Sequence, residues 1–194
     1  MSSVRPMLII MAKAPMMGRA KTRLARDIGV THAQRLYRMM MSQVLRQTDD
    51  PRWETVLAVT PISYLGRAPI WRGYKQVGQV NGSLTPRLAA VLNRKGPTVV
   101  IGTDCPEISA CDIADAFKAI KKGKAVLGPA DDGGFWLIGM NGPAPRYLFE
   151  DVRWSHEETL KDMEARFKKP VAYLRTLVDV DDFAALKVWK APVD

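Results

Sequence analysis

The sequence contains few of the residues that cross-link small proteins or bind structural metals: its 194 residues include two cysteines and two histidines. Cys105 and Cys111 have no histidine near them, and their spacing does not match the paired ligands of structural zinc. A chain of this length buries roughly 70% of its unfolded surface on folding, so it needs no cross-links to be stable. We therefore expect two free, reduced thiols in a cytoplasmic protein.

Long apolar runs are also missing. Near the N-terminus the longest covers residues 7–12, whereas a membrane-spanning helix needs roughly 20 apolar residues. Lys13 and Pro15 end this run, and no cleavage site of a signal peptide follows it. Because the sequence also has no internal repeat or low-complexity linker, it predicts a cytoplasmic protein with no membrane segment, folded as one domain over residues 1–194.

Acidic residues are outnumbered, since 29 Lys and Arg against 20 Asp and Glu give a formal net charge of +9. Such an excess favours an anionic partner, which could be nucleic acid, a membrane surface or a phosphorylated metabolite. Residues 13–26 concentrate five cations and no acid. The chain lacks a recognised nucleic-acid motif, an aromatic stacking set and a basic tail, so a non-enzymatic nucleic-acid-binding protein is the weaker alternative. Its binding would fall steeply with salt.

Strand-like and helix-like segments alternate along the chain. Short apolar runs predict buried strands, and apolar residues at helical spacing predict helices. Capping-box spacings at residues 31–34 and 155–158 predict the starts of two helices. The expected fold is α/β, a mixed, mainly parallel sheet with helices on both faces, which binds ligands at the carboxyl ends of its strands. The expected strands are residues 7–11, 55–59, 74–79, 98–101, 125–127, 135–140 and 171–174, and the expected helices are residues 31–48, 84–92, 108–121, 155–168 and 183–189.

The basic segment follows the first expected strand. Backbone amides of such a loop can accept phosphate oxygens while Lys and Arg neutralise their charge. The spacing of Gly18, Lys21 and Thr22 resembles a P-loop only in part, because that motif needs a second glycine and position 15 is proline. The alternative is a solvated basic loop. The residues concerned are Lys13, Gly18, Arg19, Lys21, Thr22 and Arg23.

Carboxylates follow two other expected strands. Asp104, at the end of residues 98–101, can hold a Mg²⁺ that also binds substrate phosphates, or it can cap the helix that starts near Ser109. Asp131 and Asp132 precede Gly133 and Gly134, a pair that predicts a tight turn with at least one positive φ and a close approach of ligand to backbone. The alternative is a hairpin turn, which Asp-Gly favours.

A further pair of carboxylates lies near the C-terminus. Asp179 and Asp181 alternate on an extended segment, so both point to one side and could share a cation. Asp181 is also a good N-cap for the last helix. His156 could act as an acid or base, although its place in the capping-box spacing fits a surface helix position equally well. His32 is interpreted as structural, and the methionines as core filler.

These segments together resemble a known family. Lys-Ala-Pro-x-x-Gly-Arg-x-Lys-Thr-Arg-Leu at residues 13–24, Ile-Gly-Thr-Asp-Cys-Pro at 101–106, Gly-Pro-Ala-x-Asp-Gly-Gly-Phe at 128–135, Trp-Ser at 154–155 and Asp-Val-Asp at 179–181 resemble the radical-SAM/selenodomain-associated transferase family. That family is similar to the nucleotide-diphospho-sugar transferases with the glycosyltransferase-A fold, whose relatives include phospholactate guanylyltransferase and molybdenum-cofactor guanylyltransferase. Where the family usually carries Gly-Asp-Leu-Gly-x-Arg, residues 82–87 lack the Asp and the second Gly and keep Arg87.

The resemblance implies a role for each loop. The basic segment and Arg87 would bind the nucleotide phosphates, Asp104 with Asp179 and Asp181 would bind Mg²⁺ or Mn²⁺, and residues 131–134 would border a small-molecule acceptor, with Asp104 and Asp132 catalytic. The implied reaction is attack on a phosphate-linked leaving group with the metal and the basic loop stabilising negative charge. The donor would be a nucleotide-sugar in a glycosyltransferase, which the family name favours, or a nucleoside triphosphate in a nucleotidyltransferase, which the basic loop favours.

Overall fold

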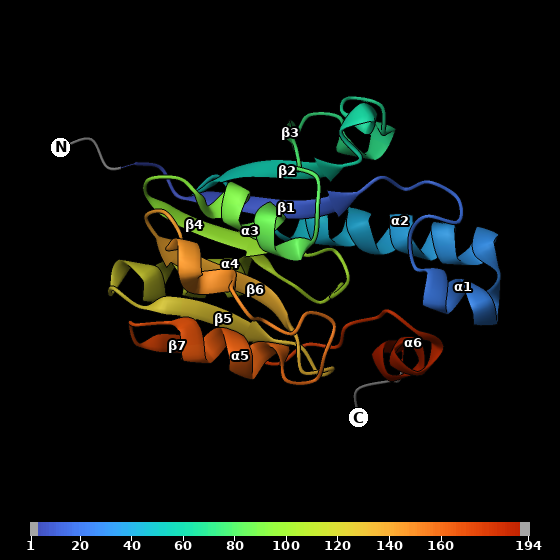
Figure 1. Cartoon of the computed structure of the whole chain (residues 1–194). Helices are drawn as coiled ribbons and strands as arrows, with labels where there is room; N and C mark the ends of the chain where they lie inside the picture. The colour runs from blue at the N-terminus through green and yellow to red at the C-terminus, as the bar shows by residue number, and fades with distance from the viewer. Residues whose placement is uncertain (1–3, 191–194) are drawn as a thin grey trace.

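A computed structural model describes residues 4–190 of the chain and shows an α/β fold in which one sheet carries helices on both faces (Figure 1). Seven strands form the sheet: β1 Met7–Lys13, β2 Glu54–Thr60, β3 Lys75–Gly78, β4 Pro97–Ile101, β5 Ala125–Pro129, β6 Phe135–Asn141 and β7 Val171–Tyr173. The helices are α1 Thr22–Ile28, α2 Val30–Gln47, α3 Leu84–Leu92, α4 Ala110–Lys121, α5 Thr159–Arg166 and α6 Phe183–Lys190. The predicted fold class is confirmed.

The strand order is β3-β2-β1-β4-β6-β5-β7. β1 pairs in parallel with β2 and β4, β2 with β3, and β5 with β7, while β6 runs antiparallel to both of its neighbours. The parallel strands therefore all end at one edge of the sheet, and β6 begins there. Open α/β sheets bind ligands outside this edge.

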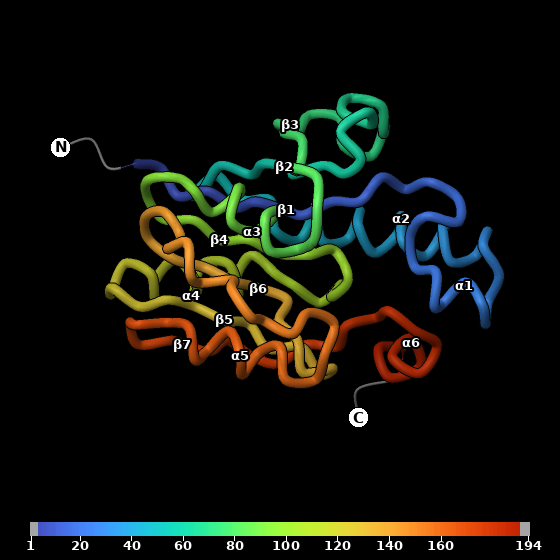
Figure 2. The backbone as a smooth tube through the Cα atoms, in the orientation of Figure 1, coloured from blue at the N-terminus to red at the C-terminus, as the bar shows by residue number. Residues whose placement is uncertain are grey.

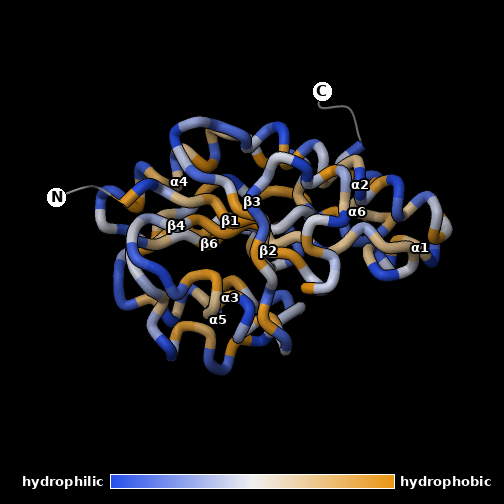
Figure 3. The backbone as a smooth tube through the Cα atoms, turned by 90° about the horizontal axis from the view of Figure 1, so that it is seen from above, coloured by the Kyte–Doolittle hydropathy of each residue, from blue (hydrophilic) through white to orange (hydrophobic). Residues whose placement is uncertain are grey.

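Alternating side chains of the strands face two different cores, as the pleat of a strand requires. On β1, Leu8 and Ile10 pack with α2 and α4 residues, whereas Ile9 packs with Leu88 of α3 and Met163 of α5. Both faces are therefore apolar, which explains the continuous apolar runs that predicted these strands. Seen along the sheet, the apolar strands lie between the two helical layers (Figure 3).

A third, smaller core lies beyond the strand ends. α6 packs against α1 (Figure 2). Five buried residues from α1, α2, α6 and the segment that leads into α6 form the centre of this core: Leu24, Leu36, Met40, Val180 and Leu186. The C-terminal part of the chain thus returns to cover the loop that follows β1.

The start of α2 differs from the prediction. The helix begins at Val30, with Gly29 as its N-cap and no side-chain cap, so the capping box predicted at residues 31–34 is wrong. Gln34 instead donates from Nε2 to the carbonyl of Pro15, 2.8 Å away. Gln34, which a capping box would use at the start of the helix, is therefore bonded to the basic loop instead.

The second predicted capping box is also wrong. α5 begins at Thr159 rather than Ser155, and Glu158 at its N-cap makes no side-chain cap. The hydroxyl of Thr159 bonds the chain before the helix instead, accepting from the amide of His156 at 3.2 Å and donating to the carbonyl of Arg153. Residues 155–158 therefore form turns that lead into the helix.

Two other caps replace ones considered from the sequence. Ser109 and Asp112 form a complete capping box at α4, so Asp104 is not a cap there. Asp182 rather than Asp181 accepts from the amide of Ala185 at the start of α6, at 2.9 Å. Asp104 and Asp181 are consequently not used as helix caps.

Two further expectations concern the thiols and the membrane. Both cysteines are free, Cys105 buried and Cys111 exposed. Across residues 4–190 no helix combines the length and the apolar character that crossing a bilayer requires.

Candidate active site

A buried ion-pair cluster lies at the carboxyl ends of β1 and β4. The Nζ atom of Lys21 is 2.6 Å from Oδ1 of Asp104 and 3.8 Å from Oδ1 of Asp181. The Lys21 side chain is 2% exposed, whereas each of the two carboxylates is 45% exposed. The ammonium therefore lies beneath the carboxylates, which face the outside.

The backbone of Lys21 adopts an unusual conformation that turns its side chain inward. Its φ is 52° and its ψ 47°, the left-handed region, at the N-cap of α1. Such a conformation costs a non-glycine residue about 1 kcal/mol or more and persists where the surroundings impose it. Burial lowers the pKa of Lys21, but attraction by Asp104, Asp179 and Asp181 outweighs that effect and leaves its pKa raised. Lys21 is thus held as a buried cation by carboxylates.

Asp179 carries the opposite perturbation. Burial raises its pKa to about 7, and repulsion by Asp104 adds to the rise while Lys21 opposes it. Its Oδ1 atom is buried and has no hydrogen-bond partner among residues 4–190. Buried polar atoms are normally paired. This carboxylate oxygen is therefore available to bind a cation or to accept a hydrogen bond from a ligand.

Backbone and side-chain bonds fix the relative positions of three loops in this cluster. The amide of Val180 donates to the carbonyl of Asp104 at 3.0 Å. The amide of Asp179 donates to Oδ1 of Asp131 at 2.9 Å, and the amide of Asp131 donates to the carbonyl of Leu177 at 3.0 Å. The two segments that the sequence analysis assigned to metal and acceptor are therefore tied directly together.

The turn between β5 and β6 is a hairpin, as the alternative interpretation of Asp132-Gly133 held, and it also borders a cavity. Gly133 has a φ of 84°, which confirms the predicted positive φ, while Gly134 is outside that region. The amide of Gly134 donates to Oδ1 of Asp132 at 2.9 Å. A Cβ on Gly133 would lie 2.1 Å from the carbonyl oxygen of Glu157, so the close approach at this glycine is to the chain itself.

Gly133→Ala should therefore lower the free energy of unfolding by about 2 kcal/mol or more, because alanine is strained at this φ and its methyl group meets backbone. Urea denaturation measures the change. Gly123→Ala is the matched control, since Gly123 has a φ of 80° but open space around its Cβ position. If the two variants lose equal stability, the contact with Glu157 has no energetic weight.

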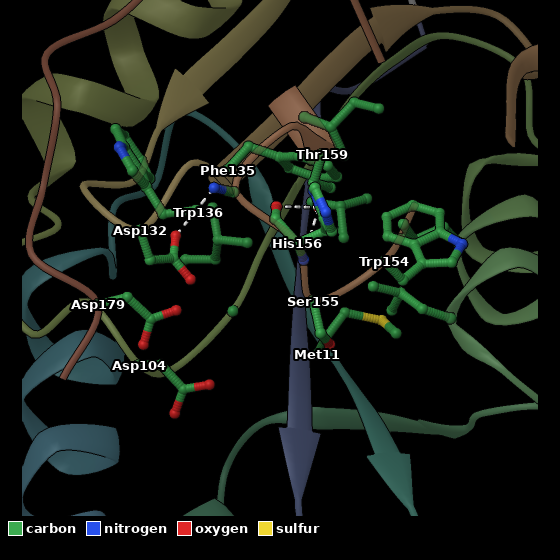
Figure 4. A pocket seen from close by; sticks show the side chains of 17 residues that line it. Met11, Asp104, Asp132, Phe135, Trp136, Trp154, Ser155, His156, Thr159 and Asp179 are labelled. Carbon is green, nitrogen blue, oxygen red and sulfur yellow. Dashed lines mark hydrogen bonds between the residues drawn. The ribbon is translucent and has the colours of Figure 1, made fainter. Parts of the chain in front are cut away.

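The cavity beside this turn has a volume of about 300 Å³ and connects the carboxylates to an apolar wall. Asp104, Asp132 and Asp179 line one end, where their carboxylates lie near one another (Figure 4). Apolar side chains from β1, α3, β4, β6 and the segment before α5 line the rest. Residues from distant parts of the sequence thus converge on one space at the predicted edge of the sheet.

Aromatic residues to which no role was assigned from the sequence form part of the apolar wall. The Trp154 indole donates from Nε1 to the hydroxyl of Thr85 at 2.8 Å, and its ring lies 6.1 Å from that of Phe135 and 6.4 Å from that of Phe149, centroid to centroid. Thr85 lies in residues 82–87, the segment that departs from the pattern of the family that the sequence resembles. The Trp-Ser motif was the available signal for this wall.

His156 also lines the cavity, next to Ser155 with its positive φ of 56°. Its Nδ1 accepts from the amide of Glu158 at 3.1 Å. A neutral imidazole that accepts at Nδ1 carries its proton on Nε2. Neither sequence interpretation of His156 anticipated this placement in the turns ahead of α5.

The basic loop is divided between the surface and the cluster. Lys13, Arg19 and Arg23 are exposed, and Nη1 of Arg23 lies 3.2 Å from Oδ2 of Asp181. Gly18, with a φ of 69°, and Thr22 are also exposed. Lys21 is the exception, because its side chain is buried and paired with Asp104, so the loop is not solvated throughout. Arg87 lies half-buried on α3 and does not line the cavity.

The predicted three-carboxylate metal site is not preassembled. Within residues 4–190, no three His, Cys, Asp or Glu side chains are arranged to hold a metal ion, and the Lys21 ammonium lies where the carboxylates of Asp104 and Asp181 converge. Two carboxylates remain suited to a cation, because Asp104 and Asp179 face the same cavity and Oδ1 of Asp179 is unpaired. Mg²⁺ commonly uses only one or two protein carboxylates together with substrate phosphates and water.

Comparison with solved structures defines the class of fold. A Desulfovibrio desulfuricans G20 protein described as a nucleotide-diphospho-sugar transferase matches with a TM-score of 0.84 at 22% identity, covering 95% of this chain and 86% of that chain. CMP:2-keto-3-deoxy-manno-octonic acid synthetase, solved with CTP, matches with a TM-score of 0.56 at 12% identity, covering 96% and 97%. The Rv0371c protein of Mycobacterium tuberculosis H37Rv, solved with manganese, matches with a TM-score of 0.55 at 17% identity, covering 95% and 97%. The chain shares its fold with these proteins.

The family follows from the sequence itself. The pattern of the family described as "Uncharacterized protein conserved in bacteria" (DUF2064) matches residues 43–156, from α2 to the cavity residue His156. The chain belongs to this family. No curated protein matches the sequence.

Proposed function

We propose that the protein is a metal-dependent transferase that moves a glycosyl group from a nucleotide-sugar to a small-molecule acceptor. The observation that carries this proposal is the arrangement of Asp104 and Asp179 at one end of a cavity, at the edge of the sheet where such folds bind ligands. The description of the Desulfovibrio protein as a nucleotide-diphospho-sugar transferase supports it.

In this proposal each part of the site has one task. Asp104 and Asp179 would hold Mg²⁺ or Mn²⁺, with Asp181 beside them, and the manganese in the Rv0371c structure supports a divalent cation. When bound, the cation stabilises the negative charge that develops on the leaving nucleoside diphosphate. Arg19, Arg23 and Lys13 would neutralise the phosphates from the solvent side.

Asp132 would serve the acceptor. Its Oδ1 is fixed by the amide of Gly134, which leaves Oδ2 to accept the proton of an acceptor hydroxyl. The acceptor oxygen then forms a bond to the anomeric carbon while the bond from that carbon to the diphosphate breaks, and the nucleoside diphosphate leaves with the bonding electrons. Asp131 would act through Asp179, whose amide it holds.

A nucleotidyltransferase is the second candidate. The cytidylyl synthetase with CTP supports it, as does the exposed part of the basic loop, because three cations can neutralise a triphosphate. In that reaction a phosphorylated substrate would attack the α-phosphate and release pyrophosphate. The two reactions make different demands on the acceptor end of the cavity.

Nucleotide binding tests both candidates. A panel of nucleoside triphosphates and nucleotide-sugars is screened in the presence of Mg²⁺. A nucleotide that binds, at a concentration of one hundred times its Kd, should raise the free energy of unfolding by about 2.7 kcal/mol. For a chain of this size, that raises the melting temperature by several degrees. Arg23→Ala should weaken the binding, whereas Arg52→Ala, an exposed arginine paired with Asp50 ahead of β2, should leave it unchanged. No metal-dependent shift with any nucleotide would contradict the proposal.

A further inference from the structure

The charged side chains that line the cavity are all acidic. Three carboxylates line the cavity, those of Asp104, Asp132 and Asp179, and no Lys or Arg of residues 4–190 does. Lys21 does not line the cavity, and its buried ammonium is already paired with Asp104 at 2.6 Å. A phosphate or carboxylate placed in this cavity would therefore meet only like charges, since phosphate sites are built from Arg, Lys and backbone amides.

A divalent cation would not make the acceptor end cationic. Held by Asp104 and Asp179, it would balance two of the three carboxylates, and its free coordination positions would be taken by donor phosphates and water. Asp132, on the hairpin turn, would keep its charge. An anionic acceptor would still face this carboxylate without a partner of its own.

The opposite end of the cavity provides a rigid apolar surface. The bond from Trp154 to Thr85 fixes the indole plane, and contacts with Phe135 and Phe149 restrict it further. Leu84 and Leu88 of α3 line the same space. Such a wall favours a ligand with a flat apolar face.

Between the wall and the carboxylates, His156 supplies a neutral hydrogen-bond donor. Because its Nδ1 accepts from the amide of Glu158, the neutral ring offers Nε2–H, and no group among residues 4–190 accepts from that atom. Nε2–H suits a hydroxyl or ether oxygen of a ligand. The cavity thus combines an apolar face, one neutral donor and carboxylate acceptors.

We propose that this cavity binds an acceptor that has an apolar face and hydroxyl groups and carries no anionic group. The proposal rests on the proposed transferase function and selects within it: hydroxyl acceptors of glycosyl transfer fit the cavity, whereas a phosphorylated nucleophile of nucleotidyl transfer does not. Trp154 and His156 are then the specificity-determining residues of the acceptor end.

Two matched probes test the acceptor class in the absence of nucleotide and metal. Phenyl β-D-glucopyranoside is neutral and phenyl phosphate is anionic, and both carry the same ring. The Trp154 side-chain N–H signal, one of five tryptophan signals in the ¹⁵N spectrum and assigned with Trp154→Phe, reports binding. The neutral probe should shift this signal with a Kd at least about tenfold lower than that of phenyl phosphate.

Two variants separate the contributions. Asp132→Asn keeps an oxygen for the Gly134 amide and removes one charge, so phenyl phosphate should bind roughly threefold to tenfold more tightly while the neutral probe changes little. In His156→Gln the side-chain amide lies near the position of Nε2 and keeps a donor there. In His156→Asn the shorter side chain reaches only the position of Nδ1. The neutral probe should therefore bind the His156→Gln variant more tightly than the His156→Asn variant.

The outcomes are distinguishable from failure of the proposed function, which is judged by nucleotide binding with Mg²⁺. Equal or tighter binding of phenyl phosphate at Trp154 would overturn the acceptor assignment even if nucleotides bind. Failure of the neutral probe to move the Trp154 signal would overturn it as well. Selective binding of the neutral probe without any nucleotide binding would retain the cavity assignment and remove the transferase.

Discussion

Lys21→Met should lower the free energy of unfolding by about 3 kcal/mol in metal-free buffer. Methionine has a similar length but no charge, so Asp104, Asp179 and Asp181 would lose their shared buried counter-ion. Removing one partner of a buried ion pair typically costs about 3–5 kcal/mol, and the partial exposure of Asp104 and Asp181 places this case at the low end. Urea denaturation with a chelator present measures the change.

Arg23→Ala is the matched control for this prediction. Arg23 lies in the same loop and also pairs with Asp181, but its side chain is 67% exposed, so its loss should change stability by less than about 1 kcal/mol. Mg²⁺ should restore part of the stability of Lys21→Met, because the freed carboxylates gain a cation. Equal losses in the two variants would show that the burial of Lys21 has no energetic consequence.

Asp104→Asn should reduce turnover at least about a hundredfold while the protein still folds. The amide keeps the shape of the carboxylate but removes the charge through which it would bind the divalent cation, and metal stabilisation of a leaving group is worth several kcal/mol. Lys21 loses the charge of its 2.6 Å partner but keeps Asp181 within 3.8 Å and an amide oxygen as acceptor, so the melting temperature should fall by less than in Lys21→Met. Activity is measured as nucleoside diphosphate released in the presence of Mg²⁺ and a hydroxyl acceptor.

The control for Asp104→Asn is Glu107→Gln, three residues further along the same loop and exposed. It should retain activity, because its side chain does not line the cavity. Wild-type turnover in Asp104→Asn, at any Mg²⁺ concentration, would remove Asp104 from the catalytic site.

The strands were predictable because their apolar runs reflect burial on both faces of the sheet. Helix starts were less predictable. In the two capping-box spacings, Gln34 donates to the carbonyl of Pro15 and Glu158 pairs with Lys161 at 3.0 Å, so neither side chain caps a helix. α1 escaped prediction because a seven-residue helix rich in charge has little propensity of its own; Leu24 is buried only by packing with α2 and α6.

The placement of Asp104 and Asp132 at the cavity was predictable from their positions after strands, since the carboxyl ends of parallel strands meet at one edge. Asp179 was identified instead from its alternation with Asp181 on an extended segment. The burial of Lys21 was not predictable. It depends on Asp181, which arrives from the far end of the chain, and on a left-handed backbone at a residue that rarely adopts one. The aromatic wall was missed because Thr85 and Trp154 are 69 residues apart and meet only in the fold.

The bonds that join the C-terminal segment to the β1–α1 loop set an order on the assembly of the molecule. Arg23 and Asp181 are 158 residues apart, and Val180 completes both the backbone bond to Asp104 and the small core around Leu24. During synthesis, the first strands can pair before these residues have left the ribosome. Lys21 gains its partners Asp179 and Asp181 only afterwards. The charged centre is therefore completed last, and a ribosome-bound or truncated chain that ends before residue 178 would have Asp104 but lack Asp179 at the cavity and Asp181 beside Lys21.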